Sequence, residues 1–317
     1  MNAHYQRRFK LHVESIIGQP IIQWDGRLGL AVSGGPDSLA MMLLAQAVMP
    51  GKIAVATVNH GLRREAEAET RYVAELCEER GIDCAILTPE TPITGNIQSA
   101  ARAARYGLLH GWAEQSGCDK IATAHHADDQ LETILMRLAR GSGVDGLSGV
   151  RPQNGAIIRP LLGFTKAELV SICEDAGLAS ISDPSNDNAD FDRVRIRQWL
   201  AATDHPLSAL SAAISASALA EASDALDWSA RRLAPLHIRA DGTDICFDPA
   251  NLPPELLRRL LLMALRHIIP DYRPRGPSLT RLIDSLQRGE TAMIGDILCI
   301  PGDIWRLRSA PPRSKQK

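Results

Sequence analysis

Residues 30–40 read LAVSGGPDSLA, and this stretch decides how the first half of the chain is interpreted. Its first three residues are apolar, as in a buried strand, and the residues after Ser38 have the apolar content of a helix. Glycines let a backbone approach a ligand closely, and Pro36 suits the first turn of a helix. The free amide groups of that turn, together with the helix dipole, favour an anion such as phosphate.

Asp37 is the unexpected member of this turn, because a carboxylate repels a phosphate unless a cation lies between them. Mg²⁺ binds through one or two carboxylates plus phosphates. We therefore expect Mg²⁺ and a pyrophosphate group here, with Asp37 as the metal ligand. The loop lacks the lysine of a Walker A motif, and a plain capped turn is the alternative. The predicted ATP-binding residues are Ser33, Gly34, Gly35, Pro36, Asp37 and Ser38.

Short apolar segments alternate with amphipathic segments over the first 165 residues. The predicted strands cover residues 28–32, 53–58, 84–88, 120–124 and 156–161. The predicted helices cover residues 38–48, 66–80, 97–116, 128–140 and, beyond the last strand, 165–176. This alternation predicts an α/β fold with a mainly parallel sheet flanked by helices. Ligands of such a sheet bind at the carboxyl ends of its strands.

Polar residues follow the second and third predicted strands. His60 lies in the sequence NHGLRR directly after the second strand, where an ordinary loop is the alternative. Arg102, Arg105 and Tyr106 lie on the next helix, and Arg102 and Tyr106 share one face. A guanidinium group binds phosphate in a bidentate manner, whereas a solvated surface arginine is the alternative.

A histidine and acid cluster follows the fourth predicted strand, in the sequence AHHADDQLE. Its members are His125, His126, Asp128, Asp129 and Glu132. Two acids four residues apart project from one helical face and can hold Mg²⁺ or an ammonium group. Zinc is less suitable for such an oxygen-rich set, and a helix-capping aspartate is the structural alternative.

The C-terminal part has a different composition. From residue 193 onward there are 18 Lys and Arg against 13 Asp and Glu, whereas the whole chain has a net charge of −2. We expect domains at 1–200 and 201–317, the second smaller, mostly helical and with a few short strands. Its arginines are candidates for phosphate contacts, and ordinary solvated arginines are the alternative. These arginines are Arg231, Arg232, Arg258, Arg259, Arg273, Arg275, Arg306 and Arg308.

Several classes of protein are disfavoured by composition. The six cysteines are scattered without a C-x-x-C pair, which predicts neither a zinc site nor a disulfide framework. No apolar run approaches the roughly 18–20 residues of a membrane span, and the first residues have no apolar signal core. We therefore expect a cytoplasmic protein without a membrane partner.

The motifs together resemble a known family. The sequence SGGPDS is similar to the loop of the PP-loop ATP pyrophosphatases, which cleave ATP between the α- and β-phosphates. Within that superfamily, VNHGLR, AARAARY, HHADDQLETILMRLARGSGVDGL, IIRPLL and SDPSN occur in the order seen in the tRNA(Ile)-lysidine synthetase family. The resemblance covers roughly residues 28–200 and is highly specific as an ordered set.

The resemblance implies a two-step ligation. ATP would adenylate the C2 oxygen of the wobble cytidine of an isoleucine tRNA with a CAU anticodon, and free L-lysine would then attack C2 and displace AMP to give lysidine. His60, Arg102 and Arg105 would compensate phosphate charge, while Asp128, Asp129 and Glu132, with His125 beside them, would hold lysine or a metal. Asp183, Ser185 and Asn186 would shape the cytidine pocket. Arg193, Arg195, Arg197, Arg231 and Arg232 are expected to contact tRNA.

One residue departs from the family pattern. Val194 stands where the family's R-N-x-x-R motif has Asn, so any hydrogen bond of that Asn is absent.

Three alternatives remain at this point. Another PP-loop enzyme is one, such as a tRNA thiolase, although no C-x-x-C is present. An amidotransferase-type synthetase would need a glutaminase segment, and a nucleotide-sensing or RNA-binding module would not need the acid cluster. The oligomeric state is not fixed by the sequence, and a homodimer is left open.

Overall fold

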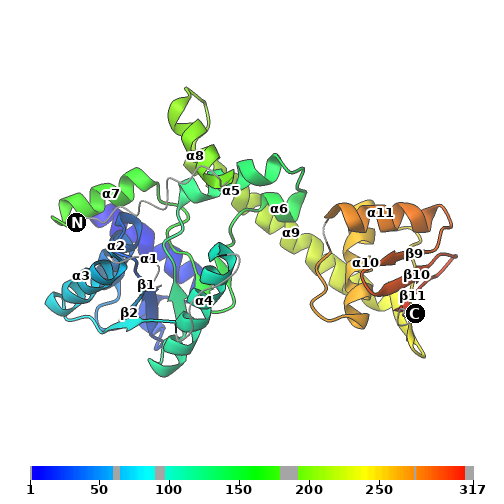
Figure 1. Ribbon diagram of the computed structural model, residues 1–317, viewed down its shortest axis with the longest axis horizontal. Coiled ribbons are helices and arrows are strands. Elements are labelled where there is room, and N and C mark those ends of the chain that lie inside the picture. Colours follow the sequence, from blue (N-terminus) through cyan, green and yellow to red (C-terminus); the bar gives the residue numbers. More distant parts are fainter. Residues whose placement is uncertain (1, 60–64, 90–96, 179–191, 275, 311–317) are drawn as a thin grey trace, which may run out of the picture. The chain divides into compact units, whose positions relative to one another are not determined.

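The computed structural model describes residues 2–59, 65–89, 97–178, 192–274 and 276–310, with the side chains of residues 65 and 97–102 excepted. These residues form two compact units, Met1–Ala218 (unit 1) and Leu219–Lys317 (unit 2). The border between the units lies inside one long helix, α9 (Ala209–His237) (Figure 1). The sequence analysis places a domain boundary near residue 200, before this helix.

A six-stranded sheet forms the centre of unit 1. Its strands are β1 (Leu28–Ala31), β2 (Ile53–Val58), β3 (Cys84–Leu87), β4 (Lys120–Ala122), β5 (Gln153–Asn154) and β6 (Ile157–Ile158). Their order is β3-β2-β1-β4-β6-β5, and only the β5–β6 pair is antiparallel. The chain passes from β1 outward to β3 and then returns to place β4 on the other side of β1. The carboxyl ends of β1 and β4 therefore meet at the topological switch point, where such sheets bind ligands.

Helices surround this sheet on both faces. They are α1 (Ala3–Ile17), α2 (Pro36–Val48), α3 (Glu65–Glu79), α4 (Ile97–Gln115), α5 (Ala127–Leu138), α6 (Val144–Leu147), α7 (Lys166–Asp175) and α8 (Asp192–Ala202), with a short 3₁₀ turn at Ile21–Gln23. Alternate residues of β2 point to opposite faces: Val55 packs in the core with α2, whereas Ala54 and Ala56 pack against α4. The predicted mainly parallel sheet with flanking helices is thus confirmed.

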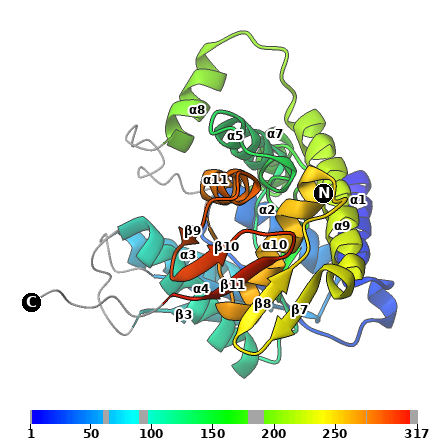
Figure 2. The same ribbon diagram turned by 90° about the vertical axis from the view of Figure 1, so that its right-hand side faces the viewer.

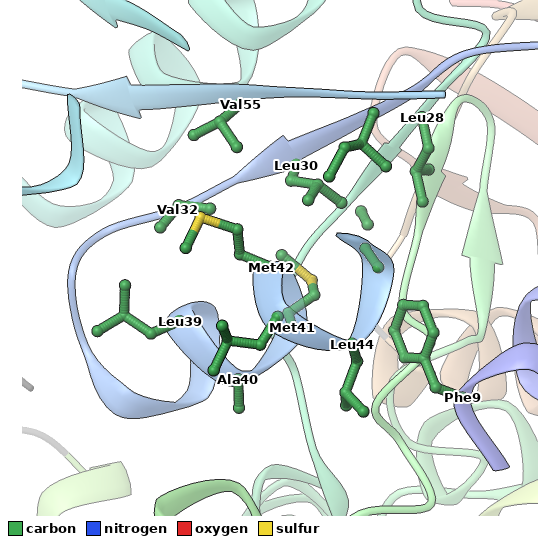
Figure 3. Packing of buried hydrophobic residues seen from close by; sticks show 14 of the residues in the cluster. Phe9, Leu28, Leu30, Val32, Leu39, Ala40, Met41, Met42, Leu44 and Val55 are labelled. Atoms are coloured by element: carbon green, nitrogen blue, oxygen red, sulfur yellow. The ribbon is translucent and has the colours of Figure 1, made fainter. Parts of the chain in front are cut away.

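The core beneath the predicted phosphate loop is closely packed. Leu30 and Val32 of the β1 region contact the apolar face of α2, which contributes Met42, and Phe9 reaches the same cluster from α1 (Figure 3). Each such side chain contributes about 1.5–3 kcal/mol when it is fully buried. Because α2 is buried along its first three turns, the loop that precedes it is held in a fixed place.

Unit 2 has a separate core built on a five-stranded antiparallel sheet. The strands are β7 (Ile238–Asp241), β8 (Asp244–Phe247), β9 (Ala292–Ile294), β10 (Ile297–Ile300) and β11 (Trp305–Ser309), in the order β7-β8-β11-β10-β9 (Figure 2). Helices α10 (Pro254–Ile268) and α11 (Gly276–Gln287) pack on it through leucines. The predicted helices and short strands are present, and β7 and β8 form an additional hairpin.

In the described residues, no helix is both long and apolar enough to cross a membrane.

Candidate active site

The loop after β1 is shaped by local hydrogen bonds. Gly34 has a φ of +84°, a left-handed conformation that side chains disfavour, and Gly35 is the N-cap of α2. The Ser38 hydroxyl donates to the Gly35 carbonyl at 3.0 Å and accepts from the Ser33 amide at 3.1 Å. Ser38 thus closes the loop back on itself. Pro36 occupies the first helical turn, as the sequence predicts, which leaves the turn's other amide groups available for an anion.

The loop after β4 places a histidine among three carboxylates. His126 is the N-cap of α5 and is 5% exposed. Its Nε2 lies 3.5 Å from Asp37 Oδ2 and 3.7 Å from Asp129 Oδ2, and its Nδ1 lies 3.4 Å from Asp128 Oδ2. We call His126, Asp37, Asp128 and Asp129 the acidic cluster. It joins the phosphate loop of β1 to the helix start after β4.

Opposing effects set the charge of the cluster. Burial lowers the pKa of His126, but the hydrogen-bonding and charge effects of Asp128, Asp37 and Asp129 outweigh it and raise that pKa to about 10. Burial would raise the pKa values of Asp128 and Asp129, but His126 and other neighbours lower both. At neutral pH the His126 imidazolium ion therefore lies beside the ionised carboxylates of Asp128 and Asp129.

Asp128 also connects α5 to α7. Its Oδ2 accepts a hydrogen bond of 2.8 Å from the backbone amide of Lys166, the first residue of α7. The same helix contributes Cys173, whose thiol donates to the Pro36 carbonyl at 3.2 Å. The start of α2 and the start of α5 are therefore both braced by α7.

Glu132 is paired with two arginines of α8. Arg197 binds both of its carboxylate oxygens, at 2.8 and 3.1 Å, and Arg193 Nε lies 3.0 Å from Oε2. Arg193 also reaches Asp129 Oδ1 at 3.7 Å. The Glu132 carboxylate raises the pKa of Arg197, so this pair stays charged. Glu132 thus fixes α8 to α5, and Val194 between the arginines is buried.

Mg²⁺ fits the oxygen atoms of this site. Asp37 Oδ1 is buried and has no hydrogen-bond partner among the described residues, as suits a ligand of a hard cation. In the same part of the chain, no three His, Cys, Asp or Glu side chains are grouped so as to hold an ion by themselves. Mg²⁺ needs only one or two carboxylates when phosphates complete its coordination, so the donor set suits a nucleotide-bound ion.

Of the remaining predicted site residues of unit 1, the structure describes some and not others. His125 lies beside the cluster, with Nδ1 3.0 Å from Thr123 Oγ1. Arg105 lies on α4 with its guanidinium over the ring of Tyr106. Arg102 lies on the same helix, but its side chain is outside the described residues. His60, Asp183, Ser185 and Asn186 also lie outside the described residues.

The arginines of unit 2 fall into two groups. Arg258 and Arg259 pair with Glu255, Arg259 also pairs with Asp227, and Arg306 and Arg308 pair with Asp241 and Asp244. Arg231 and Arg232 are exposed on α9, and Arg232 lies over the ring of Trp228. Arg273 is exposed after α10, and Arg275 lies outside the described residues.

His126 is a candidate site residue that the sequence did not single out. The sequence analysis included it in the cluster but chose His125 for the site. The observed helix α5 begins at Ala127, one residue before the predicted start, and His126 three residues before Asp129 then has the spacing of a capping residue.

Comparisons with known proteins agree with this geometry. A family model described as a PP-loop domain matches residues 1–203. The tRNA(Ile)-lysidine synthase of Zymomonas mobilis is 42% identical over 98% of this chain and 95% of its own length. That of Novosphingobium aromaticivorans is 45% identical over 90% of each chain. Among solved structures, the U34-tRNA thiolase from Methanococcus maripaludis is 21% identical with a TM-score of 0.56, over 68% of this chain and 80% of that one. This last likeness shows the fold alone.

Proposed function

The chain belongs to the tRNA(Ile)-lysidine synthase family of PP-loop proteins, and from this premise we propose how its residues carry out the reaction of that family. It is a ligase that acts on isoleucine tRNA, with ATP and lysine as its other substrates. The observation that carries the proposal is the contact between Asp37 of the phosphate loop and His126 of the acidic cluster. This contact places the proposed nucleotide site next to the proposed lysine site, with about one side chain between them.

The first step activates the wobble cytidine of the CAU anticodon. The C2 oxygen of cytosine attacks the α-phosphate of ATP, a C–O–P linkage forms, and the bond to pyrophosphate breaks. Ser33, Gly34, Gly35 and Ser38, with the amide groups at the start of α2, hold the departing pyrophosphate. Asp37 would hold Mg²⁺, and the bound ion would compensate the negative charge of the phosphates. His60, Arg102 and Arg105 remain proposed as further cations for this step.

The second step forms the new carbon–nitrogen bond. The ε-amine of lysine attacks C2, the C–O bond to the adenylate breaks, and AMP leaves with the former C2 oxygen on its phosphate. Asp128 and Asp129 have lowered pKa values, so they suit the ammonium form of lysine as ion-pair partners. Before the attack the ammonium group gives its proton to a nearby carboxylate, and the neutral amine is the nucleophile. His125 lines the same region, and Asp183, Ser185 and Asn186 remain proposed contacts to the cytidine.

Glu132 receives a refined role in this proposal. The sequence analysis assigned it to lysine or metal binding, but both of its oxygens face arginines of α8. We propose that it positions Arg193 and Arg197 beside Asp129, so that α8 forms one wall of the lysine site.

The direct test is lysine incorporation. Incubation with ATP, MgCl₂, labelled lysine and a CAU-anticodon isoleucine tRNA transcript should label the RNA and release AMP and pyrophosphate in equal amounts. A methionine tRNA transcript with the same anticodon is the control and should stay unlabelled. If no transcript incorporates labelled lysine, the proposal is wrong.

A variant separates the proposed metal role from binding of the RNA. Asp37→Ala should abolish pyrophosphate release while tRNA binding without ATP is retained. Wild-type release by this variant would contradict the assignment of Asp37 to Mg²⁺. A homodimer remains a prediction, which sedimentation of the full chain would test.

A further inference from the structure

Helix α8 has two chemically different faces. Arg193 and Arg197, one turn apart, reach the acids of α5. Arg195 and Trp199 are also one turn apart, and at 3.6 residues per turn they lie on the opposite side. Both are exposed, and in the described part of the chain Arg195 makes no ion pair. The inner face is therefore occupied, and the outer face presents a guanidinium and an indole to solvent.

The indole of Trp199 lies next to the ring of His205. The ring of His205 lies 5.9 Å from it, centroid to centroid, with an angle of 21° between the planes. His205 is itself fixed, because its Nε2 donates to the carbonyl of Leu200 at 3.1 Å. Trp199 is still 48% exposed. The two rings are nearly parallel but offset, so the indole keeps a large surface open to solvent.

We propose that Arg195 and Trp199 bind a nucleotide of the anticodon loop that neighbours the wobble cytidine. Trp199 stacks on its base, and Arg195 contacts its phosphate. A held aromatic face beside an unpaired cation is the combination with which proteins bind single-stranded nucleic acid. The inference rests on the proposed function, since it takes the RNA substrate as the occupant.

The position of the pair favours a neighbouring nucleotide over a distant one. An α-helix with its side chains is about 10–12 Å across, so the outer face of α8 lies about that far from Glu132 and Asp129 on its inner side. Stacked nucleotides of one strand are about 3.4 Å apart along the helix axis. A base within a few nucleotides of the reacting cytidine can therefore reach Trp199.

The test measures equilibrium binding of an RNA hairpin with the anticodon stem and loop of the CAU isoleucine tRNA. Trp199→Leu keeps an apolar side chain without an aromatic face and should weaken binding about tenfold, within the roughly 1–3 kcal/mol of one base stack. Trp199→Phe keeps an aromatic face and should bind within about threefold of wild type. A thermal melt of each variant checks that unit 1 remains folded.

The arginine has its own matched pair. Arg195→Gln should weaken hairpin binding and reduce the slope of log K against log salt by about one. Arg7→Gln removes the same charge from an exposed site on α1 and should leave both unchanged.

Two results would overturn the inference. One is hairpin binding by Trp199→Leu equal to wild type, with an unchanged KM for tRNA. The other is a change in self-association only, which would make this face a contact between copies of the chain. Hairpin binding is measured without ATP or lysine, so its outcome is distinguishable from failure of wild type to incorporate lysine.

Discussion

At the scale of single residues, the imidazole of His126 separates three carboxylates that would otherwise repel one another. Its ring nitrogens lie 3.4–3.7 Å from Asp37, Asp128 and Asp129. His126→Asn removes the cation and should lower the free energy of unfolding by about 2–4 kcal/mol, near the value for breaking a buried ion pair but reduced because two of the acids are partly exposed. Urea denaturation of the variant measures this.

His110→Asn is the control for that change. His110 lies exposed on α4, so its replacement should alter stability by less than about 0.5 kcal/mol. Equal midpoints for the two variants would contradict the role assigned to the His126 imidazole.

Residue types were easier to predict than residue partners. Asp37 was identified from the sequence because a carboxylate inside a phosphate loop is chemically unusual there. The pairing of Asp37 with His126 was not, because it depends on β4 lying next to β1, 92 residues later in the chain. Glu132 was read as a ligand for the same reason: its partners Arg193 and Arg197 follow about 60 residues later and approach only through the packing of α8 on α5.

At the scale of elements, the ion pairs of α8 differ in burial and therefore in strength. Glu132 is buried and holds Arg193 and Arg197, whereas the pair between Arg140 and Asp192 is exposed. Glu132→Gln removes the buried carboxylate that both arginines share, and of the ion pairs of Arg193 the one with Asp129 remains. The change should raise the rate of amide hydrogen exchange in α8, with a loss of about 2–4 kcal/mol in the free energy of local opening.

Arg140→Gln is the comparison, because Arg140 follows α5 and pairs with Asp192 at the start of α8. An exposed pair contributes about 0–1 kcal/mol, so exchange in α8 should change little. A larger effect of Arg140→Gln than of Glu132→Gln would mean that the acids of α5 do not fix this helix.

The first turn of α7 gives a pH-dependent prediction. Burial alone would raise the pKa of the Glu168 carboxyl, but Arg8 and the Thr165 amide bind it and lower its pKa below the usual value. A carboxyl with a lowered folded pKa stabilises the fold above its unfolded pKa of about 4.3, and this contribution is lost as the pH falls through the folded value.

Glu168→Gln should therefore reduce stability at pH 7 and have a smaller effect well below pH 4. Chemical denaturation of wild type and variant across this range measures the difference between them. A difference that stays constant with pH would show that the charge of Glu168 is not what matters.

Strong periodic segments were predicted well at this scale, whereas weak ones were missed. The strand Ile53–Val58 has the predicted bounds and α2 has the predicted end at Val48, although it begins at Pro36 and not at Ser38; uninterrupted apolar runs fix these segments. Helix α1 was not predicted, although Asn2 caps its start and Gly18, with a φ of +76°, ends it. The hairpin of β7 and β8 was also missed, despite the turn-forming pair Asp241-Gly242.

At the scale of the whole molecule, contact with tRNA should depend on salt. Phosphate contacts release counterions, so the affinity of the full chain for isoleucine tRNA should fall steeply between 50 and 200 mM salt. Arg231 and Arg232 are the stronger candidates in unit 2, because Arg258 and Arg259 are already paired with acids. A flat response to salt would rule out phosphate contacts as the main source of affinity.

Two variants test which arginines cause the salt dependence of tRNA binding. Arg231→Gln with Arg232→Gln should lower the magnitude of the salt slope by about one or two, whereas Arg288→Gln, which removes an exposed arginine paired with Glu290, should leave it unchanged.

The strand order of unit 1 also sets when the enzyme becomes competent during its synthesis. The phosphate loop follows β1, but its acidic partners come after β4, and the arginines that hold Glu132 arrive only with α8 at Asp192–Ala202. A nascent chain that has emerged as far as β3 has the loop without the acids that complete it. Domains generally fold as units while the ribosome extends them. The proposed site is assembled from three distant segments, so we expect it to form only after about residue 200 has left the exit tunnel. Shorter nascent chains would carry the phosphate loop without the acids of α5 and the arginines of α8.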